Sequence, residues 1–335
     1  MKRWLQRAGM LLAIAGSLVF VGYVLSTLDI ESLREHLTMR ALTALGAAAL
    51  LYAFLVPLGA LAWQWMLAAL GHRERLLPLL AIFATTQAGK YLPGNVGHHV
   101  GRVGLSLAQG IPLPILVASM AYEICLLLLA DLFTALGAGS LSAPGLRVLL
   151  QIGNGSSGVV VAACLAVLGL AAIPLLSRSL PWLTTLVIRR RGGTDVAPVA
   201  LPVRTMLRVI ALYILAMLLM GAGLSVLALG LFPATPIDFA LLTTAFALAW
   251  VVGFVTPGAP AGLGVREAVL LLLLAHGMGA ANASLLILTL RIATTLGDML
   301  CFILGLAVMP RARALRRAPP QESAMPQGPI KQDPQ

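Results

Sequence analysis

Long apolar stretches are the feature that most constrains how this chain can fold. Several of them exceed the ~18 apolar residues that an α-helix needs to span a bilayer. Hydrophobic residues make up 59% of the 335 residues and charged residues only 10%, whereas soluble proteins average about 25% charged residues. The sequence therefore predicts an all-α, polytopic integral membrane protein.

Six stretches fit transmembrane helices, at about residues 9–28, 41–70, 112–137, 159–176, 207–231 and 281–309. The first resembles a signal peptide, but its apolar run is long and no clean cleavage site follows it, so we expect a retained helix. Residues 140–158 and the Arg-rich residues 177–208 are predicted to be loops, and residues 311–335 a disordered cytoplasmic tail.

Two irregular, polar stretches interrupt the apolar pattern, at residues 90–102 and 256–267. Each contains Pro-Gly, followed by further glycines and an arginine. Irregular backbone at membrane depth persists only where protein or a water-filled cavity covers it. The apolar segments beside these stretches are too short to cross, so we expect two re-entrant hairpins, at residues 76–110 and about 241–276.

The two interruptions also indicate an internal repeat, since Pro93-Gly94 and Pro257-Gly258 lie 164 residues apart. We predict one membrane domain over residues 1–310, with repeats at about 41–137 and 207–309. Three predicted crossings separate the repeats, so the second is expected to be inverted. Inverted repeats are typical of secondary transporters, whose site lies near the bilayer midplane.

The net charge is +11, and the basic residues responsible for it cluster just outside the apolar spans. This is the positive-inside pattern and argues against nucleic-acid binding. With both termini in the cytoplasm, every basic cluster falls on the cytoplasmic side. We therefore predict a multi-pass protein of a bacterial-type inner membrane.

Ionisable residues inside the predicted spans are the candidate site. A charge at the bilayer centre costs about 2.5–3.5 kcal/mol, so such residues must pair or line a wet cavity. The candidates for substrate binding are Lys90, Arg102, Glu123, Arg266, Glu267, Arg291 and Asp298. Asp131 is expected to be structural, and some of the other charges could serve only to fasten helices.

The glycines and prolines of the interruptions could turn backbone N–H groups towards a ligand. These motif residues are Pro93, Gly94, Gly97, Pro257, Gly258, Gly262 and Gly264. Helix N-termini and arginines together suit a phosphate or a similar anion. Close helix packing is the alternative reason for the glycines.

No pattern of catalytic or metal-ligating residues stands out. The neighbouring His98 and His99 project differently and lack a further ligand at metal spacing, so we expect no metal site. Residues 97–102 do not form a nucleotide loop, since no strand precedes them and no Lys-Ser/Thr follows. We expect no cofactor and no enzymatic activity.

The two interruptions resemble those of the flippase-like membrane domain of the lysylphosphatidylglycerol synthase family. The resemblance rests on Lys90-Tyr91-Leu92-Pro93-Gly94 with Arg102, and on residues 257–268 followed by Leu290-Arg291, and it extends over about residues 10–310. It implies re-entrant helices and the movement of charged or glycosylated lipids between leaflets. The Glu-Arg then Asp pattern of the family is absent after Glu123, and we expect no lysyl transfer because no soluble aminoacyl-transfer domain is present.

The sequence therefore favours a translocase for a phosphate-containing lipid, such as an aminoacyl-phospholipid or a polyprenyl-linked lipid. Arg102, Arg266 and Arg291 would hold the phosphate, while Glu123, Glu267 and Asp298 would balance charge or meet a cationic headgroup. Two alternatives stay open: a non-transporting partner of a glycosyltransferase or lipid-modifying enzyme, and an integral enzyme acting on a lipid phosphate. Homo-oligomers are left open.

Overall fold

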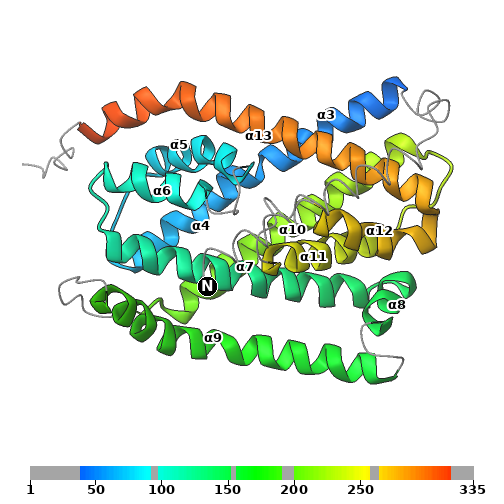
Figure 1. Cartoon of the computed structure of the whole chain (residues 1–335), viewed down its shortest axis with the longest axis horizontal. Helices are drawn as coiled ribbons and strands as arrows, with labels where there is room; N and C mark the ends of the chain where they lie inside the picture. Colours follow the sequence, from blue (N-terminus) through cyan, green and yellow to red (C-terminus); the bar gives the residue numbers. More distant parts are fainter. Residues whose placement is uncertain (1–37, 92–96, 152–155, 191–199, 257–263, 318–335) are drawn as a thin grey trace, which may run out of the picture.

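The computed structural model describes residues 38–91, 97–151, 156–190, 200–256 and 264–317. All regular elements within these ranges are helices (Figure 1). Within this part of the chain, five helices are long and apolar enough to cross a membrane: Met39–Ala69, Leu113–Gly139, Ala163–Trp182, Val203–Leu231 and Ala280–Ala312. The prediction of an all-α, multi-pass membrane fold is confirmed, and the predicted helix at 9–28 lies outside the described residues.

The first half of the fold consists of a long helical segment, two short helices and a second long helix. Its elements are α3 (Met39–Ala53), α4 (Leu55–Ala69), α5 (Leu76–Thr86), the 3₁₀ helix η1 (Gln87–Tyr91), α6 (Gly97–Leu107) and α7 (Leu113–Ser140). Because α3 and α4 are separated only by a turn at Phe54, they correspond to one predicted span.

The second half repeats this order of long, short, short and long helices. Its elements are α10 (Val203–Leu231), α11 (Phe239–Val255), α12 (Val265–Met278) and α13 (Ala280–Arg317). Two further helices, α8 (Ala143–Gln151) and α9 (Ser156–Arg190), connect the halves, and α9 lies along the outside of α7 (Figure 1).

The short helices bracket both interruptions of the apolar pattern. α5 and α6 have 11 residues each, so each is about 16 Å long and cannot cross a hydrocarbon core of about 30 Å. α5 packs on α6, and α11 packs on α12. These pairs occupy the positions of the expected hairpins, and the side from which each enters the membrane stays a prediction.

Corresponding helices of the two halves pack against the opposite half in the same pattern. α5 of the first half packs against α13 of the second, and its counterpart α11 packs against α7 of the first half. Likewise α3 contacts α13 while α10 contacts α7, and α3 and α10 contact each other. This reciprocity is what a two-fold relation between the halves would produce.

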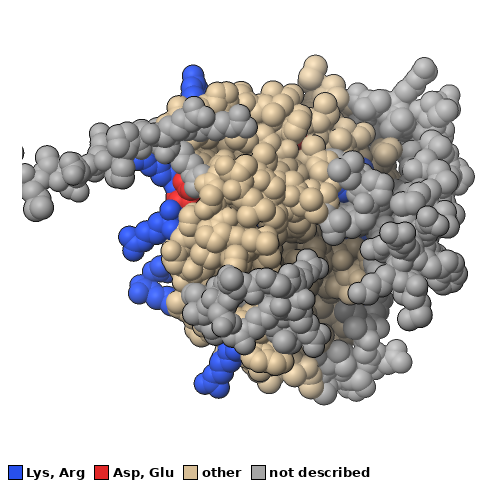
Figure 2. Space-filling model, turned by 60° about the vertical axis from the view of Figure 1, so that its left-hand side comes forward, with Lys and Arg blue, Asp and Glu red and all other residues tan. Residues whose placement is uncertain are grey.

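Two apolar cores hold the bundle together. One joins α3 to α10, α11, α12 and α13, and the other joins α4, α5 and α7 to the first part of α10. Since α10 contributes to both cores, it is the structural axis of the molecule. Figure 2 shows one face whose described surface is largely uncharged, with basic side chains along one edge, as expected for a protein surrounded by lipid.

The structure contradicts the prediction of loops at 140–158 and 177–208, because much of both segments is helical. In α8, Val148 and Leu149 are buried, so an apolar face outweighs the turn-forming composition. α9 continues to Arg190 despite its internal prolines. Its later part is anchored by buried Leu180 and by Ser177, whose hydroxyl donates to the Leu201 carbonyl at 3.0 Å.

The prediction of disorder from residue 311 was also wrong for the first residues of the tail. α13 continues to Arg317, and Ala312 is fully buried in a small cluster with Ala81 and Met309. Contact with α5 therefore supports the continuation of the helix by about two turns, in a segment whose basic composition suggested a solvated tail.

Close contact between α13 and α5 depends on Gly305. A Cβ at this position would lie 2.9 Å from both Ala84 Cβ and the Thr85 backbone nitrogen. We expect Gly305→Ala to destabilise the protein by about 1–3 kcal/mol, because a well-packed interface has no room for the methyl group. Thermal unfolding in detergent would measure the effect.

Gly46 provides the matched control, since a Cβ there meets nothing within 4 Å. Gly46→Ala should keep or raise stability, because alanine favours a helix over glycine by roughly 0.5–1 kcal/mol. Equal melting temperatures for the two variants would contradict the packing argument.

Candidate functional site

A cavity of about 240 Å³ lies where the two halves meet. Every helix of both halves, from α3 to α7 and from α10 to α13, contributes residues to its wall. The charged lining residues are Lys90, Arg102, Glu123, Arg266, Arg291 and Asp298. The rest of the wall is mainly apolar, so the charges face a confined space of low polarity.

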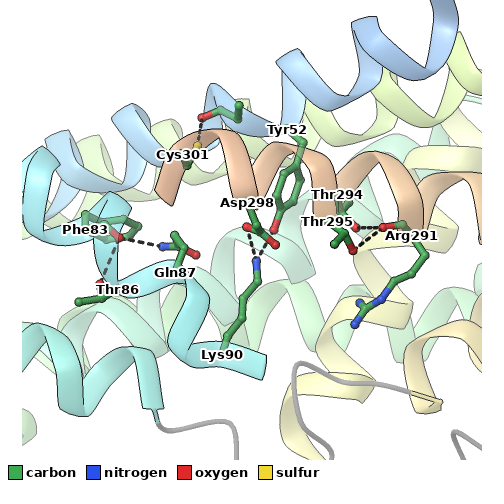
Figure 3. Close-up of polar contacts among 11 residues, drawn as sticks. Tyr52, Phe83, Thr86, Gln87, Lys90, Arg291, Thr294, Thr295, Asp298 and Cys301 are labelled. Carbon is green, nitrogen blue, oxygen red and sulfur yellow. Dashed lines mark hydrogen bonds and ion pairs between the residues drawn. The ribbon is translucent and has the colours of Figure 1, made fainter. Parts of the chain in front are cut away.

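Lys90 and Asp298 form an ion pair that connects the two halves (Figure 3). Lys90 Nζ on η1 lies 2.6 Å from Asp298 Oδ1 on α13, and it also donates to the Tyr52 hydroxyl at 2.6 Å. The carboxylate is almost fully buried while the lysine is 16% exposed. Lys90 is therefore neutralised by the second half and still faces the cavity.

Arg102 forms a second ion pair within the first half. Its Nη2 donates to Glu123 Oε2 at 2.7 Å, and its guanidinium lies 4.9 Å from the ring centres of both Trp63 and Phe83. The side chain is only 3% exposed. Cation–π contacts and a carboxylate thus hold Arg102 firmly, and its contact with the cavity is small.

Arg266 and Arg291 share one carboxylate in the second half. The nearest Nη atom of each lies 3.6 Å from Glu267 Oε1. The other oxygen, Oε2, accepts a hydrogen bond of 2.8 Å from the Gly264 backbone N–H and so caps α12. Because Glu267 is buried and does not line the cavity, it supports the arginines from behind.

Gly264 begins α12 with a backbone conformation that favours glycine. Its φ is +83°, in the region that side chains with a Cβ rarely adopt. This turn brings the Gly264 N–H to Glu267 and places Arg266 on the first turn of α12. The sequence motif is therefore explained locally as a helix start that positions an arginine.

The structure brings all seven predicted substrate-binding residues to the cavity or directly behind it. Arg291 has the most exposed of the paired basic side chains, at 21%, compared with 12% for Arg266. Figure 3 shows Arg291 extending from α13, the helix that also carries Asp298. Among the motif residues, Gly97 starts α6, and five others lie outside the described residues: Pro93, Gly94, Pro257, Gly258 and Gly262.

The sequence reasoning missed the aromatic residues of the site. Tyr52 bonds Lys90, Trp63 and Phe83 flank Arg102, and the ring of Trp250 stacks on that of Phe254 with centroids 5.0 Å apart. In a chain this apolar, an aromatic side chain gives no local signal of contact with a charge. These aromatic rings meet the charges only because helices far apart in the sequence pack together.

The chain also matches a known protein family. Residues 10–305 match the family described as the lysylphosphatidylglycerol synthase TM region. The chain belongs to this family. A search of curated proteins gave no match. The cavity and its paired charges therefore belong to a membrane domain of the lysylphosphatidylglycerol synthase TM region family, which is tied to lipid biology.

The Arg102–Glu123 pair should contribute strongly to stability. Glu123→Gln leaves the buried guanidinium without its counter-charge, and breaking a buried pair in this way costs about 3–5 kcal/mol. Thermal unfolding in detergent should show a large loss for Glu123→Gln. The double variant Arg102→Gln with Glu123→Gln should recover part of it, whereas additive losses would show that the pair does not fasten α6 to α7.

Proposed function

We propose that this protein moves a phosphate-containing lipid between the two leaflets of its membrane through the cavity between its halves. The main support is the excess of positive charge in this enclosed space. Lys90, Arg102, Arg266 and Arg291 give four positive charges, and Glu123, Glu267 and Asp298 give three negative ones. The excess of one suits an anionic group such as a lipid phosphate.

The distribution of exposure indicates which residues would meet the phosphate. Arg102 is buried between aromatic rings, whereas Lys90 and Arg291 are the most exposed of the paired bases. Hydrogen bonds between charged groups are short and strong, and an arginine can bind two phosphate oxygens at once. Arg291 and Lys90 would therefore hold the phosphate, with Arg266 beside them.

The size and the wall of the cavity favour a small headgroup. A volume of about 240 Å³ is below the roughly 300–1,000 Å³ of pockets for drug-sized ligands. Apolar lining residues such as Leu55, Leu127 and Met217 would cover the glycerol and the first methylenes of the acyl chains. An aminoacyl-phospholipid or a similar phospholipid fits this space better than a large polyprenyl-linked glycan.

An exchange of ion pairs would let the protein bind the lipid without leaving a charge unpaired. As the phosphate approaches Lys90 and Arg291, it takes over part of the role of Asp298 and Glu267. A cationic group on the lipid would in turn meet Asp298, which lines the cavity, while Glu267 keeps Arg266 as its partner. Each charge keeps a partner throughout, which avoids the cost of an isolated charge at membrane depth.

The proposed setting is an inner membrane with both termini in the cytoplasm, as the distribution of basic residues favours. The basic end of α13, which includes Arg311, would then lie at the cytoplasmic surface, where anionic lipids attract it.

Neutralising either exposed base should slow transport strongly. In proteoliposomes with acyl-labelled phosphatidylglycerol, we expect Arg291→Gln and Lys90→Met each to slow leaflet exchange by roughly 10–100-fold, because each removes a charged hydrogen bond worth about 1.5–3 kcal/mol. Thermal stability would confirm folding.

Arg178 on α9 is the matched control, since it is an exposed arginine outside the cavity. Arg178→Gln should exchange lipid like the wild type. Absence of exchange by the wild-type protein with this lipid, with an aminoacyl-phospholipid and with a polyprenyl phosphate would favour a non-transporting partner of a lipid-modifying enzyme instead.

A further inference from the structure

Asp131 is a buried acid that the cavity charges leave unexplained. It lies on α7, a helix long and apolar enough to span the membrane, and its side chain is fully buried. Neither carboxyl oxygen has a hydrogen-bond partner among the described residues. An isolated ionised carboxylate in such surroundings is very unfavourable, so the neutral, protonated form is the one the structure accommodates.

The two-fold relation between the halves gives Asp131 a counterpart, Asp298. On α13 the residues facing the cavity are Arg291, Thr294 and Asp298. On α7, Glu123, Ile124 and Leu127 line it, and Asp131 follows Leu127 as Asp298 follows Thr294, four residues on. Asp131 thus takes a comparable place on α7, but it is fully buried and does not itself line the cavity.

Asp131 lacks the lysine that neutralises Asp298. Lys90 lies three residues before Pro93, and the residue three before Pro257 is Phe254. The register is supported by Gly89 and Gly253, which also match. Phe254 lines the cavity and stacks on Trp250, so an apolar ring stands where the first half has its counter-charge.

Each half places a tyrosine in the wall of the cavity. Tyr52 accepts a hydrogen bond from Lys90, which pairs with Asp298 of the other half. Tyr213 on α10, the long helix that begins the second half, also lines the cavity. With the halves exchanged, Tyr213, Phe254 and Asp131 lie on the corresponding segments, and none of them is a base.

Among the described residues, the elements around α7 offer no other counter-charge close to Asp131, and the histidines of α6, His98 and His99, lie in the cavity wall. Glu123 lies two turns away on α7, about 12 Å along the axis, and is already paired with Arg102 of α6. The described parts of α4 and α11 carry no titratable side chain. The other ionisable residues of the adjoining helices α8, α9 and α10 whose side chains are described are exposed: Arg147, Cys164, Arg178, Arg204 and Arg208.

We propose that Asp131 is a proton-carrying site, and that one proton accompanies each lipid that the protein moves. In this proposal, water that enters from the cavity during the transport cycle gives a proton to the Asp131 carboxylate and forms its O–H bond, and the proton returns to water when the cavity opens to the other side. The fixed charge of Lys90 neutralises Asp298, whereas an exchangeable proton neutralises Asp131. The coupling rests on the proposed lipid translocation, whereas protonation of Asp131 does not.

Protonation can be tested on the purified protein without any lipid transport. Infrared difference spectra between alkaline and acidic solution should show a carboxylic C=O stretch that disappears in Asp131→Asn. The control Thr134→Val, about one turn further along α7 and also buried, should keep it. A spectrum unchanged by Asp131→Asn would overturn the proton site.

Coupling can be tested in proteoliposomes with a stable pH difference. With one proton per lipid, one pH unit should drive acyl-labelled phosphatidylglycerol to a leaflet ratio of up to about tenfold. Asp131→Asn should bring the ratio back to one. Phe254→Lys should do so too, because the lysine would hold Asp131 ionised as Lys90 holds Asp298.

The outcomes separate the two proposals. Lipid exchange that equilibrates to a ratio of one in the wild type, despite the pH difference, would overturn proton coupling and leave translocation standing. No lipid exchange under any condition would overturn the proposed function, and the infrared spectra would still decide whether Asp131 binds a proton.

Discussion

The ion pair between Lys90 and Asp298 is the contact on which the centre of this fold depends. It joins η1 of the first half to α13 of the second at 2.6 Å, in a wall that is otherwise mainly apolar. Charges in such a place must be paired, since breaking a buried pair costs about 3–5 kcal/mol. The same requirement brings Arg102 to Glu123 and both second-half arginines to Glu267. The Lys90–Asp298 ion pair thus both holds the halves together and places charged groups in the cavity wall.

The exchange of packing partners explains why a cavity exists where the halves meet. The first short helix of each half, α5 or α11, packs against the long final helix of the other half, so the two halves share the packing at the centre. Their interrupted backbones bring Lys90 and Arg266 inwards. The halves differ at one position of the motif: the first half carries Lys90, which pairs with Asp298, and the second carries Phe254 at the corresponding place. We regard this break in the symmetry as the feature that would give direction to a movement that a symmetric site could only equilibrate.

The sequence alone predicted the helical membrane fold, because apolar length is a local signal, and the spacing of its two Pro-Gly breaks led to the prediction of a repeat. It also named the charges around the cavity, since a charge within an apolar span is conspicuous. It failed where burial outweighs composition: α8, the later part of α9 and the last turn of α13 have turn-forming or basic sequences but are packed against neighbours. It could not identify Tyr52 or Tyr213, because their importance arises from helices far apart in the chain. It assigned Asp131 a structural role, and only the comparison with Asp298 suggested another.

The central claim is that a lipid phosphate replaces the internal ion pairs at Lys90 and Arg291. The most direct measurement is an electron cryomicroscopy structure of the protein in nanodiscs containing phosphatidylglycerol. The account predicts phosphate density in the cavity within hydrogen-bonding distance of Arg291 and Lys90, with at least one of the two moved away from its carboxylate. A cavity without a headgroup, with every ion pair intact and lipid only around the outer surface, would contradict it.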